Sequence, residues 1–435
     1  MSVTVDQSKL VLNAFAAIFQ NSLLSGDIVS WKEYDGELND RNGLNVSEQV
    51  GPRYKVTRTT NGVQDLTAGT QDSVFGSEQF KVDQVFGTSM GWGDFVKIRD
   101  IGDARESEAL SNAAVNLAEQ IDAYVLGFAA LASNNWVGTP GENVDDFDEF
   151  MSGYTRLKEE GVSDDNLRGV LPFVDKQKLG KQVALIPNDN GASPNTLRVG
   201  FKGDLGGIPT MFTQQLPILT VGNRAATGAG AINGANQNVN YKDVAVSSAP
   251  GFYMTQTINV DTFAATATVK DGEVFTIPGV YAYDNRKQAS KGYLQQFRVV
   301  GDYTAVAGVI AAMRIFPAII VPAAGAIGDD AVNTANATVD SIPADGAVLT
   351  FLGTASTQYM PRMIIQKQAV VVSTQQLVLP VTGQGMRRKL TNVPLSVRMW
   401  KNSDFNTGFH GVRFDVALNA NVRDRRRVVR LNGVA

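Results

Sequence analysis

The longest helical pattern in the chain runs from Asp103 to Ala132, and it limits the possible folds more than any other segment. A helix of about 30 residues spans about 45 Å, which is longer than a small domain is wide. Asp103 and Glu106 have the spacing of a capping signature in its first turn. Its apolar residues recur every three or four positions and form a single stripe: Leu110, Ala114, Leu117, Ile121, Val125 and Phe128. The pattern therefore predicts a stiff rod with one buried face.

The segments before this helix predict a terminal helix and a projecting hairpin. Residues 8–24 place apolar side chains on one side of a helix, which docks either on the chain's own core or on a partner. Residues 53–60, and then 78–86 with 92–98, alternate as strands do, but they carry polar residues on both faces. The glycine-bearing stretch 61–76 joins them. Because a two-stranded hairpin is marginally stable alone, we expect this one to lie on a neighbouring subunit.

A change of pattern after residue 222 predicts an inserted module. Residues 224–240 are rich in Gly, Ala and Asn, which indicates a flexible connector. Short strands separated by turns follow, so we expect an all-β module of barrel or sandwich type over 223–357. The sequence predicts a helix at 147–160, a strand and helix within 169–187, and later strands at 363–374, 377–381, 390–399 and 412–419.

The composition excludes several classes of chemistry. The chain has no cysteine, so disulfides, thiolate nucleophiles and cysteine metal sites are excluded. Its formal net charge of −4 gives no bulk basis for non-specific nucleic-acid binding. Charged residues make up 19% of the chain, below the roughly 25% of a typical soluble domain, which favours a surface covered by further copies of itself. No signal peptide or membrane-spanning stretch is recognisable, so we expect a protein made and kept in a cytoplasm, without a membrane partner.

Four segments could carry chemistry, and each has a plainer interpretation. A hydrolase using His410 is a weak alternative, because His410 lies in a predicted turn and no G-x-S-x-G motif accompanies it. The glycine-rich segment 227–234 lacks the ending of a phosphate loop, and the acidic run 142–149 lacks the ligand pattern of a calcium loop. We therefore expect no catalytic, cofactor-binding or metal-binding residue. The cluster Arg423–Arg430 could face DNA phosphates, form a protected edge strand, or make ion pairs between subunits.

Three stretches resemble one protein family. Ala113–Asp122 resembles an alanine-rich "spine" helix, and residues 203–222 resemble the segment before an insertion domain. The most specific stretch is FTIPGVYAYDNRKQ at 275–288, followed by GYLQQFRVV at 292–300, which is similar to the family's insertion-domain pattern but departs from it at Pro278 and Tyr283. On these residues the chain resembles the major capsid (coat) proteins of tailed bacteriophages with the HK97-type fold, and in particular the P22 group.

The resemblance implies an α+β capsid fold with an inserted, barrel-like all-β domain. The implied divisions are an N-arm (1–34), an E-loop region (35–100), a peripheral domain (101–164) with spine helix 103–132, an axial domain (165–222 and 358–400), the inserted domain (223–357) and C-terminal peripheral strands (401–435). The expected subunit-contact residues are Arg53, Lys55, Arg58, Phe80, Val82, Trp92, Arg425 and Arg427.

The function implied by the resemblance is structural and needs no cofactor. Pentamers and hexamers would assemble in the host cytoplasm around a scaffolding protein into an icosahedral procapsid, which expands as double-stranded DNA is packaged. The implied partners are further copies of the chain, scaffolding protein, a portal protein, DNA bound without sequence specificity and, where present, a decoration protein. An encapsulin-type cellular compartment is the nearest alternative, although such shells usually lack a large β insertion.

Overall fold

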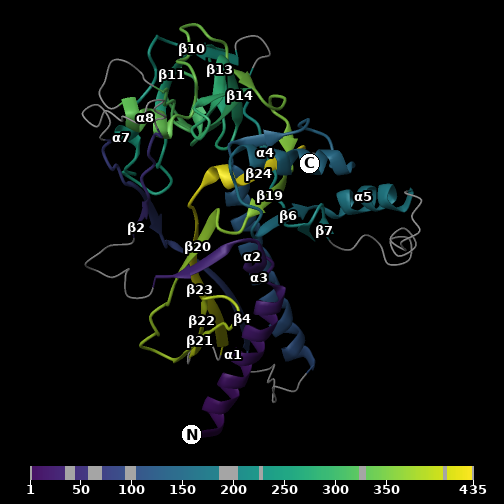
Figure 1. The fold of residues 1–435 in the computed structure, drawn as a ribbon. Coiled ribbons are helices and arrows are strands. Elements are labelled where there is room, and N and C mark those ends of the chain that lie inside the picture. The colour runs from purple at the N-terminus through teal and green to yellow at the C-terminus, as the bar shows by residue number, and fades with distance from the viewer. Residues whose placement is uncertain are drawn as a thin grey trace.

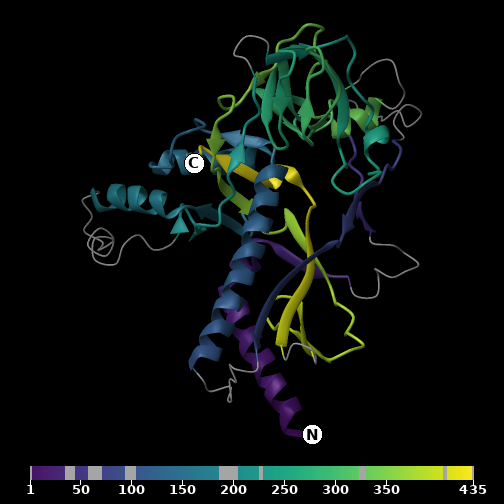
Figure 2. The ribbon, with the colours of Figure 1, turned by 180° about the vertical axis from the view of Figure 1, so that it is seen from behind.

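The computed structural model of the chain describes residues 2–34, 45–56, 71–93, 104–185, 204–224, 229–322, 330–404 and 409–433. Figure 1 shows an elongated molecule, with the N-terminus at one end, the inserted β-rich part at the other and the C-terminus between them. Figure 2, which shows the molecule from behind, places the helices of residues 2–22 and 104–132 side by side in the half of the molecule that contains the N-terminus.

The predicted long helix is confirmed as α3, Ala104–Ala132. Its 29 residues give a length of about 43 Å. Five residues of the predicted stripe are buried, and Phe128 packs against the same core while partly exposed. The proposed cap at Asp103 lies outside the described residues. The helix therefore has the single buried face that its periodicity predicts.

The N-terminal helix α1, Ser2–Ser22, packs on the chain's own core. Its Phe15 ring stacks on Phe414, with ring centroids 3.9 Å apart. Directly after it, the backbone amides of Leu24 and Ser25 both donate to the carboxylate of Asp122 on α3, at 2.8 Å. Of the two alternatives for residues 8–24, the structure shows docking on the same chain.

A first sheet covers α1 and α3 with its apolar face. Its strands pair in the order β1-β20-β23-β22-β21, and β4 pairs with the far part of β23. The bounds are β1 Ser30–Glu33, β4 Gln84–Gly93, β20 Val370–Gln375, β21 Gln384–Lys389, β22 Ser396–Asp404 and β23 Phe409–Val422. The short helix α2, Ser25–Ile28, leads from α1 into β1.

A second sheet lies at the other end of α3, in the order β5-β24-β19-β6-β8-β7. Its bounds are β5 Asn135–Val137, β6 Leu167–Leu171, β7 Asp204–Leu205, β8 Ile208–Phe212, β19 Arg362–Gln366 and β24 Val428–Leu431. The helices α4, Phe147–Glu159, and α5, Phe173–Leu185, accompany it. A buried ion pair, Arg362 with Asp175 at 2.6 Å, fixes the start of α5 to β19.

The inserted part leaves and rejoins the second sheet at one point. There β9, Leu219–Thr220, pairs with β18, Gln358–Tyr359. Between them, six strands pair in the order β10-β11-β16-β14-β13-β17, and hydrogen bonds from Ile232 to Ala347 and from Leu349 to Gly230 join the two ends of that row. The bounds are β10 Ala229–Ile232, β11 Gln256–Phe263, β13 Val274–Asp284, β14 Ala289–Val299, β16 Ile310–Phe316 and β17 Thr350–Phe351, with the pair β12 Thr268–Val269 and β15 Tyr303–Thr304.

Two helices correct the expectation of an all-β insertion, and β10 corrects the expected flexible connector. The helices are α7, Tyr241–Val244, and α8, Asp330–Asn336. The connector expected at 224–240 contains β10, and Arg224 at its start forms a buried ion pair with Glu273. Gly and Ala predict flexibility in isolation, whereas here their small side chains lie in a strand with partners on both sides.

The expected hairpin is also shifted along the chain. The strand that pairs with β3, Gly76–Lys81, is β2, Asn45–Val50, and not residues 53–60. Residues 51–56 form no regular element, and 57–70 lie outside the described residues. Polar and apolar residues alternate in both 45–50 and 53–60, so the local sequence does not show which of the two segments pairs with β3.

Two differences concern the C-terminal third. The segment 377–381 is an exposed loop and not a strand, while the basic strand β21 was not expected at all. The division expected at residue 400 falls inside β22, and β24 lies in the second sheet between β5, from the expected peripheral range, and β19, from the expected axial range.

Candidate assembly region

The ribbon, defined here as β2 and β3, is held against the inserted part of the same chain. Ser77 of β3 accepts a backbone hydrogen bond from Ser247 and donates one to Ala245, at 2.9 and 2.8 Å. Gly76 contacts the Tyr253 ring so closely that a Cβ atom there would lie 2.8 Å from it. Segment 245–247 thus lies beside β3 like an additional short strand, and the ribbon is held at the end that leads into residues 51–75.

One face of β3 is buried although a charged residue lies on it. Glu78 and Phe80 alternate with half-exposed neighbours, and both are almost fully buried. Phe80 and Val82 form a small core with Tyr34, Val371 and Ala417. These two expected contact residues therefore lie inside the single chain and not on its surface.

Glu78 and Arg425 hold the same short loop of the inserted part from two sides. The carboxylate of Glu78 accepts the amides of Gly251 and Tyr253, at 2.7 and 3.1 Å. The guanidinium of Arg425 donates to the carbonyls of the same two residues, at 2.5 and 3.0 Å, and lies over the Phe316 ring. Burial raises the pKa of Glu78, and the charge of Arg425 and the two amides offset only part of this effect. The ribbon, the inserted part and the C-terminal segment meet at this junction.

The turn that carries Arg425 is stabilised by Asp424. This carboxylate accepts the backbone amide of Arg426 and pairs with the side chains of Arg426 and Arg427, each at 3.1 Å. Burial alone would raise the pKa of Asp424, but the two guanidinium groups lower it well below its usual range. Arg427 also donates to Gln366, at 2.9 Å.

A second carboxylate connects the ribbon to β1. Glu48 of β2 accepts hydrogen bonds from Lys32 and Tyr34, at 2.8 and 3.0 Å, and lies 3.7 Å from Arg423. Burial alone would raise the pKa of Glu48, but these neighbours lower it overall. The basic residues of the C-terminal segment thus face carboxylates of their own chain.

Arg430 shows that the cluster Arg423–Arg430 is not an edge strand. Its side chain is fully buried, donates to the carbonyls of Gly272 and Ser133 and lies over the Trp136 ring. Its strand, β24, lies between β5 and β19 in the second sheet. The edge-strand interpretation of the cluster is therefore wrong.

The remaining expected contact residues are Arg53, Lys55, Arg58 and Trp92. Arg53 is exposed, and the like charge of Arg426 lowers its pKa. The backbone of Lys55 exchanges two hydrogen bonds of 2.7 Å with the Gln71 side chain. Arg58 lies outside the described residues. Trp92 pairs with β23 through its backbone, and its side chain is not among those described.

The segments considered for chemistry do not come together. The backbone of His410 lies in β23 opposite Ser403, so the expectation of a turn there is wrong, and its side chain is not among those described. The acidic run precedes α4, where Asp145 and Glu149 make a local amide-to-carboxylate hydrogen bond. Within the described parts of the chain, no three His, Asp or Glu side chains are grouped to hold a metal. No described helix has the length and apolar character needed to cross a membrane.

Sequence reasoning missed Glu78, although a signal for it exists. Glu78 and Phe80 are two positions apart in a strand and must share a face. A carboxylate on a face that buries phenylalanine requires donors nearby, because an unpaired buried charge is costly. The donors themselves, at residues 251 and 253, are too distant in sequence for any local pattern to identify.

Comparisons with known proteins complete the description of this region. A family model described as "P22 coat protein - gene protein 5" matches residues 49–428. No curated protein matches the chain.

Solved structures similar to the chain come from phages and from a virus-like particle. The chain is similar to a structure titled "Mycobacterium phage Che8", with 11% identity, a TM-score of 0.45 and coverage of 94% of this chain and 91% of that one. For "Asymmetric unit of bacteriophage PhiM1 mature capsid" the identity is 8%, the TM-score 0.46 and the coverage 94% and 86%. For "Crystal structure of virus-like particle from Pyrococcus furiosus" the identity is 8%, the TM-score 0.38 and the coverage 97% and 98%.

Proposed function

Because this chain belongs to the P22 coat protein family, whose members are structural phage capsid proteins and not enzymes, we propose a complete assembly role for it. It assembles with copies of itself in the virion shell. Pentamers and hexamers form in the host cytoplasm around a scaffolding protein, surround a portal protein and expand as double-stranded DNA is packaged. The single observation that carries this proposal is the family match, which extends from the ribbon to the C-terminal strands. The hydrolase alternative is wrong, and the encapsulin alternative has no comparable support.

The proposed domain roles are mechanical. The α3 helix stiffens each subunit, because it supports the first sheet and α1 along one buried face. The proposed inserted domain, 223–357, begins and ends beside the β9–β18 pair, which is consistent with a module added to an existing fold. The segment between β2 and β3, residues 51–75, reaches a neighbouring subunit, although its described ends also contact the inserted part of the same chain through Val56, Asp72 and Val74.

The proposed subunit contacts are the expected residues outside the core of the chain. Arg53 and Lys55 lie in the segment that follows β2, together with the exposed side chains of Tyr54 and Val56, and the exposed Phe75 lies directly before β3. Apolar side chains exposed beside basic ones favour a protein partner, because free surface of this kind gains most from burial. Arg58 belongs to the same proposal through its position in the sequence.

The experiment that tests the function is electron microscopy of the overexpressed full chain, alone and with its scaffolding protein. Closed particles of uniform diameter are expected, and lone molecules at every concentration would contradict the proposal. The matched variant replaces residues 57–70 with a short Gly-Ser linker. It leaves β2, β3 and the Glu78 junction intact, so we expect a folded protein that forms few closed shells.

Circular dichroism provides the control for this deletion. The spectrum and thermal midpoint of the variant should stay close to those of the unchanged chain. Normal shells from a folded deletion variant would show that residues 57–70 are not needed for assembly.

A further inference from the structure

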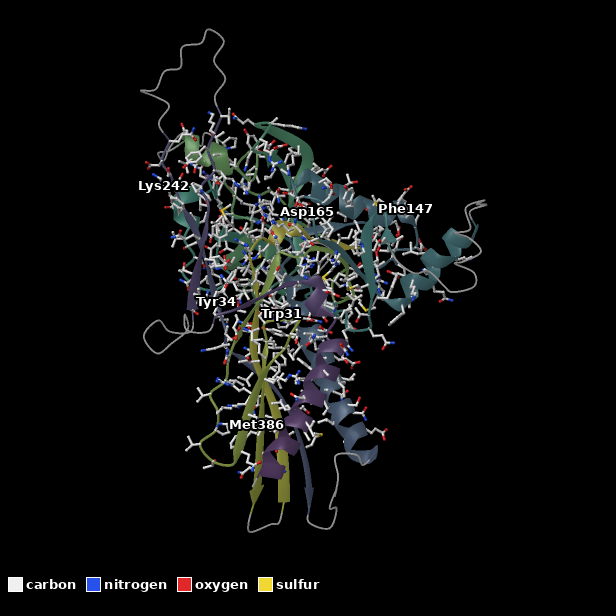
Figure 3. All side chains as sticks on the ribbon, turned by 60° about the horizontal axis from the view of Figure 1, so that its bottom comes forward. Trp31, Tyr34, Phe147, Asp165, Lys242 and Met386 are labelled. Carbon is white, nitrogen blue, oxygen red and sulfur yellow. The ribbon has the colours of Figure 1, made fainter. Side chains whose placement is uncertain are left out.

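Three buried arginines lie where the inserted part meets the C-terminal segment. Arg298 lies on β14, Arg425 lies in the turn before β24, and Arg430 lies in β24 itself. Their exposed fractions are 7%, 5% and 0%. Figures 1 and 2 show this part of the C-terminal segment, in yellow, next to the inserted part, and Figure 3 shows side chains crowded around it. We name these three residues the arginine triad.

Arg298 shares a neighbour with each of the other two arginines. It pairs directly with Phe316 across β14 and β16, so both side chains leave the same face of the sheet. The guanidinium of Arg425 lies over that phenylalanine ring, 4.8 Å from its centroid. Arg298 also donates to Asp271 at 2.9 Å, and Arg430 donates to the carbonyl of the residue that follows Asp271, at 2.8 Å.

The triad has more positive charge than its carboxylates neutralise. Its three guanidinium groups face two carboxylates, because Asp271 pairs with Arg298 and Glu78 attracts Arg425. The hydrogen bonds of Arg430 to described residues go to two backbone carbonyls. Burial lowers the pKa of Arg425 to about 10 and that of Arg430 to about 9, and the like charge of Arg298 contributes to both shifts. Buried charge of one sign is costly unless a group of opposite charge lies with it.

Two further carboxylates near the triad already have cations of their own. Asp424, the residue before Arg425, pairs with the two arginines that follow. Asp302 accepts the backbone amide of Asp271 and pairs with Lys270 at 2.9 Å. The excess of positive charge at the triad therefore remains.

Each member of the triad also has a donor without an acceptor. The Nε–H groups of Arg298, Arg425 and Arg430 are buried, and no group in the described part of the chain lies within hydrogen-bond distance of them. Among the described residues, four arginine Nε atoms are buried in this way, and three of the four belong to the triad. Unpaired donors on adjacent buried cations are the groups with which a protein binds an anion.

We propose that the arginine triad binds a small monovalent anion of the size of chloride. One negative charge balances the excess of one cation, and the anion accepts charge-assisted hydrogen bonds from the unpaired N–H groups. Because all three side chains are more than nine-tenths buried, a DNA strand or an acidic protein segment cannot reach them. A single ion can enter beside Asp271, whose side chain is 35% exposed. The bound ion would hold the inserted part, the second sheet and the C-terminal turn together, and this role does not depend on the proposed shell function.

The first test compares chloride with gluconate, an anion too large for a buried site, at constant ionic strength. Replacing gluconate by chloride should raise the thermal midpoint of the unassembled full chain by about 2 °C or more, because a ligand that binds only the folded chain stabilises it. The rise should saturate with chloride concentration. Equal midpoints in the two salts, or a rise that does not saturate, would overturn the proposal.

Three single substitutions separate binding at the triad from a general effect of salt. R298M removes one guanidinium and should lower the chloride affinity by about tenfold or more, the loss expected for one hydrogen bond to a charged group. D271N removes a carboxylate and leaves all three arginines in place, so the chloride affinity should rise. The control is K270Q, which removes a half-exposed cation of the same loop and should leave the affinity unchanged.

D271N decides the question even where R298M fails to fold. An amide at residue 271 can still accept hydrogen bonds from the Arg298 side chain and the Gly301 backbone, so we expect this variant to fold. A chloride affinity that D271N lowers or leaves unchanged would contradict the proposal. So would an affinity that a folded R298M retains or that K270Q abolishes. None of these outcomes bears on shell formation, which electron microscopy measures separately.

Discussion

At the residue scale, the attachment of the N-terminal arm depends on Asp122. Its buried carboxylate accepts the amides of Leu24 and Ser25, and burial raises the pKa of Asp122 despite these hydrogen bonds. D122A would leave both amides without a partner, so we expect a loss of about 1–3 kcal/mol in the free energy of unfolding. Denaturant titration of the unassembled full chain measures it. The control is E119Q, which removes an exposed carboxylate of the same helix and should change the free energy of unfolding by less than about 0.5 kcal/mol.

Glu78 gives a prediction about pH with a definite sign. Because burial raises its pKa above the usual 4.5, the folded chain holds this proton more tightly than the unfolded chain does. The stabilisation is complete below pH 4.5 and is lost as the pH rises through the folded pKa. The free energy of unfolding of the unchanged chain should therefore fall relative to that of E78Q as the pH rises above 4.5. Parallel curves for the two proteins would show that Glu78 titrates normally.

The arginines show what the sequence could not predict at this scale. The cluster Arg423–Arg430 was expected to face DNA phosphates, to form a protected edge strand or to make ion pairs between subunits. Its side chains instead have partners in their own chain, among them Glu48, Glu78 and carbonyls at residues 133, 251 and 272, which are 150 or more positions away. No local pattern contains that information.

At the element scale, long sequence patterns predicted helices and strands more accurately than short ones did. The 29 residues of α3 repeat their apolar spacing often enough to determine both the helix and its buried face. The short strands expected in the inserted part are present, but its helices α7 and α8 were not expected. Elements of four to six residues, such as β2, β10 and β21, were missed or displaced, because their identity depends on a partner strand.

The inserted part has a core of its own, which predicts independent folding. Every residue of its main apolar cluster lies between Ile232 and Leu349. Residues 223–357 expressed alone should therefore give a dispersed amide spectrum and a cooperative thermal transition. The hydrogen bonds of Arg430 with Gly272 and of Gln296 with Trp136 would be missing from this fragment, which should lower the thermal midpoint but not abolish folding. A collapsed amide spectrum would contradict both the boundary and the independence of this core.

At the scale of the whole molecule, the distribution of charge separates a container from a DNA-binding protein. Arg423 and Arg425–Arg427 face Glu48, Glu78 and Asp424 of the same chain, and Arg430 is buried. Few of these cations remain to neutralise phosphates, and the chain as a whole has a net charge of −4. We therefore expect the unassembled chain to bind duplex DNA with a Kd weaker than about 10⁻⁴ M at physiological salt, as measured by fluorescence anisotropy.

The salt dependence of DNA binding tests whether the arginine cluster contacts phosphates more directly than the dissociation constant does. Each phosphate that a protein neutralises makes the slope of log K against log salt steeper by about one unit, so a slope near zero is expected here. R423E and R427E should leave the weak affinity almost unchanged, because both side chains already face carboxylates. A slope of several units that falls in these variants would show that the cluster binds DNA. A shell with a slope near zero can release its genome without breaking many ionic contacts, which is consistent with the internal use of its arginines.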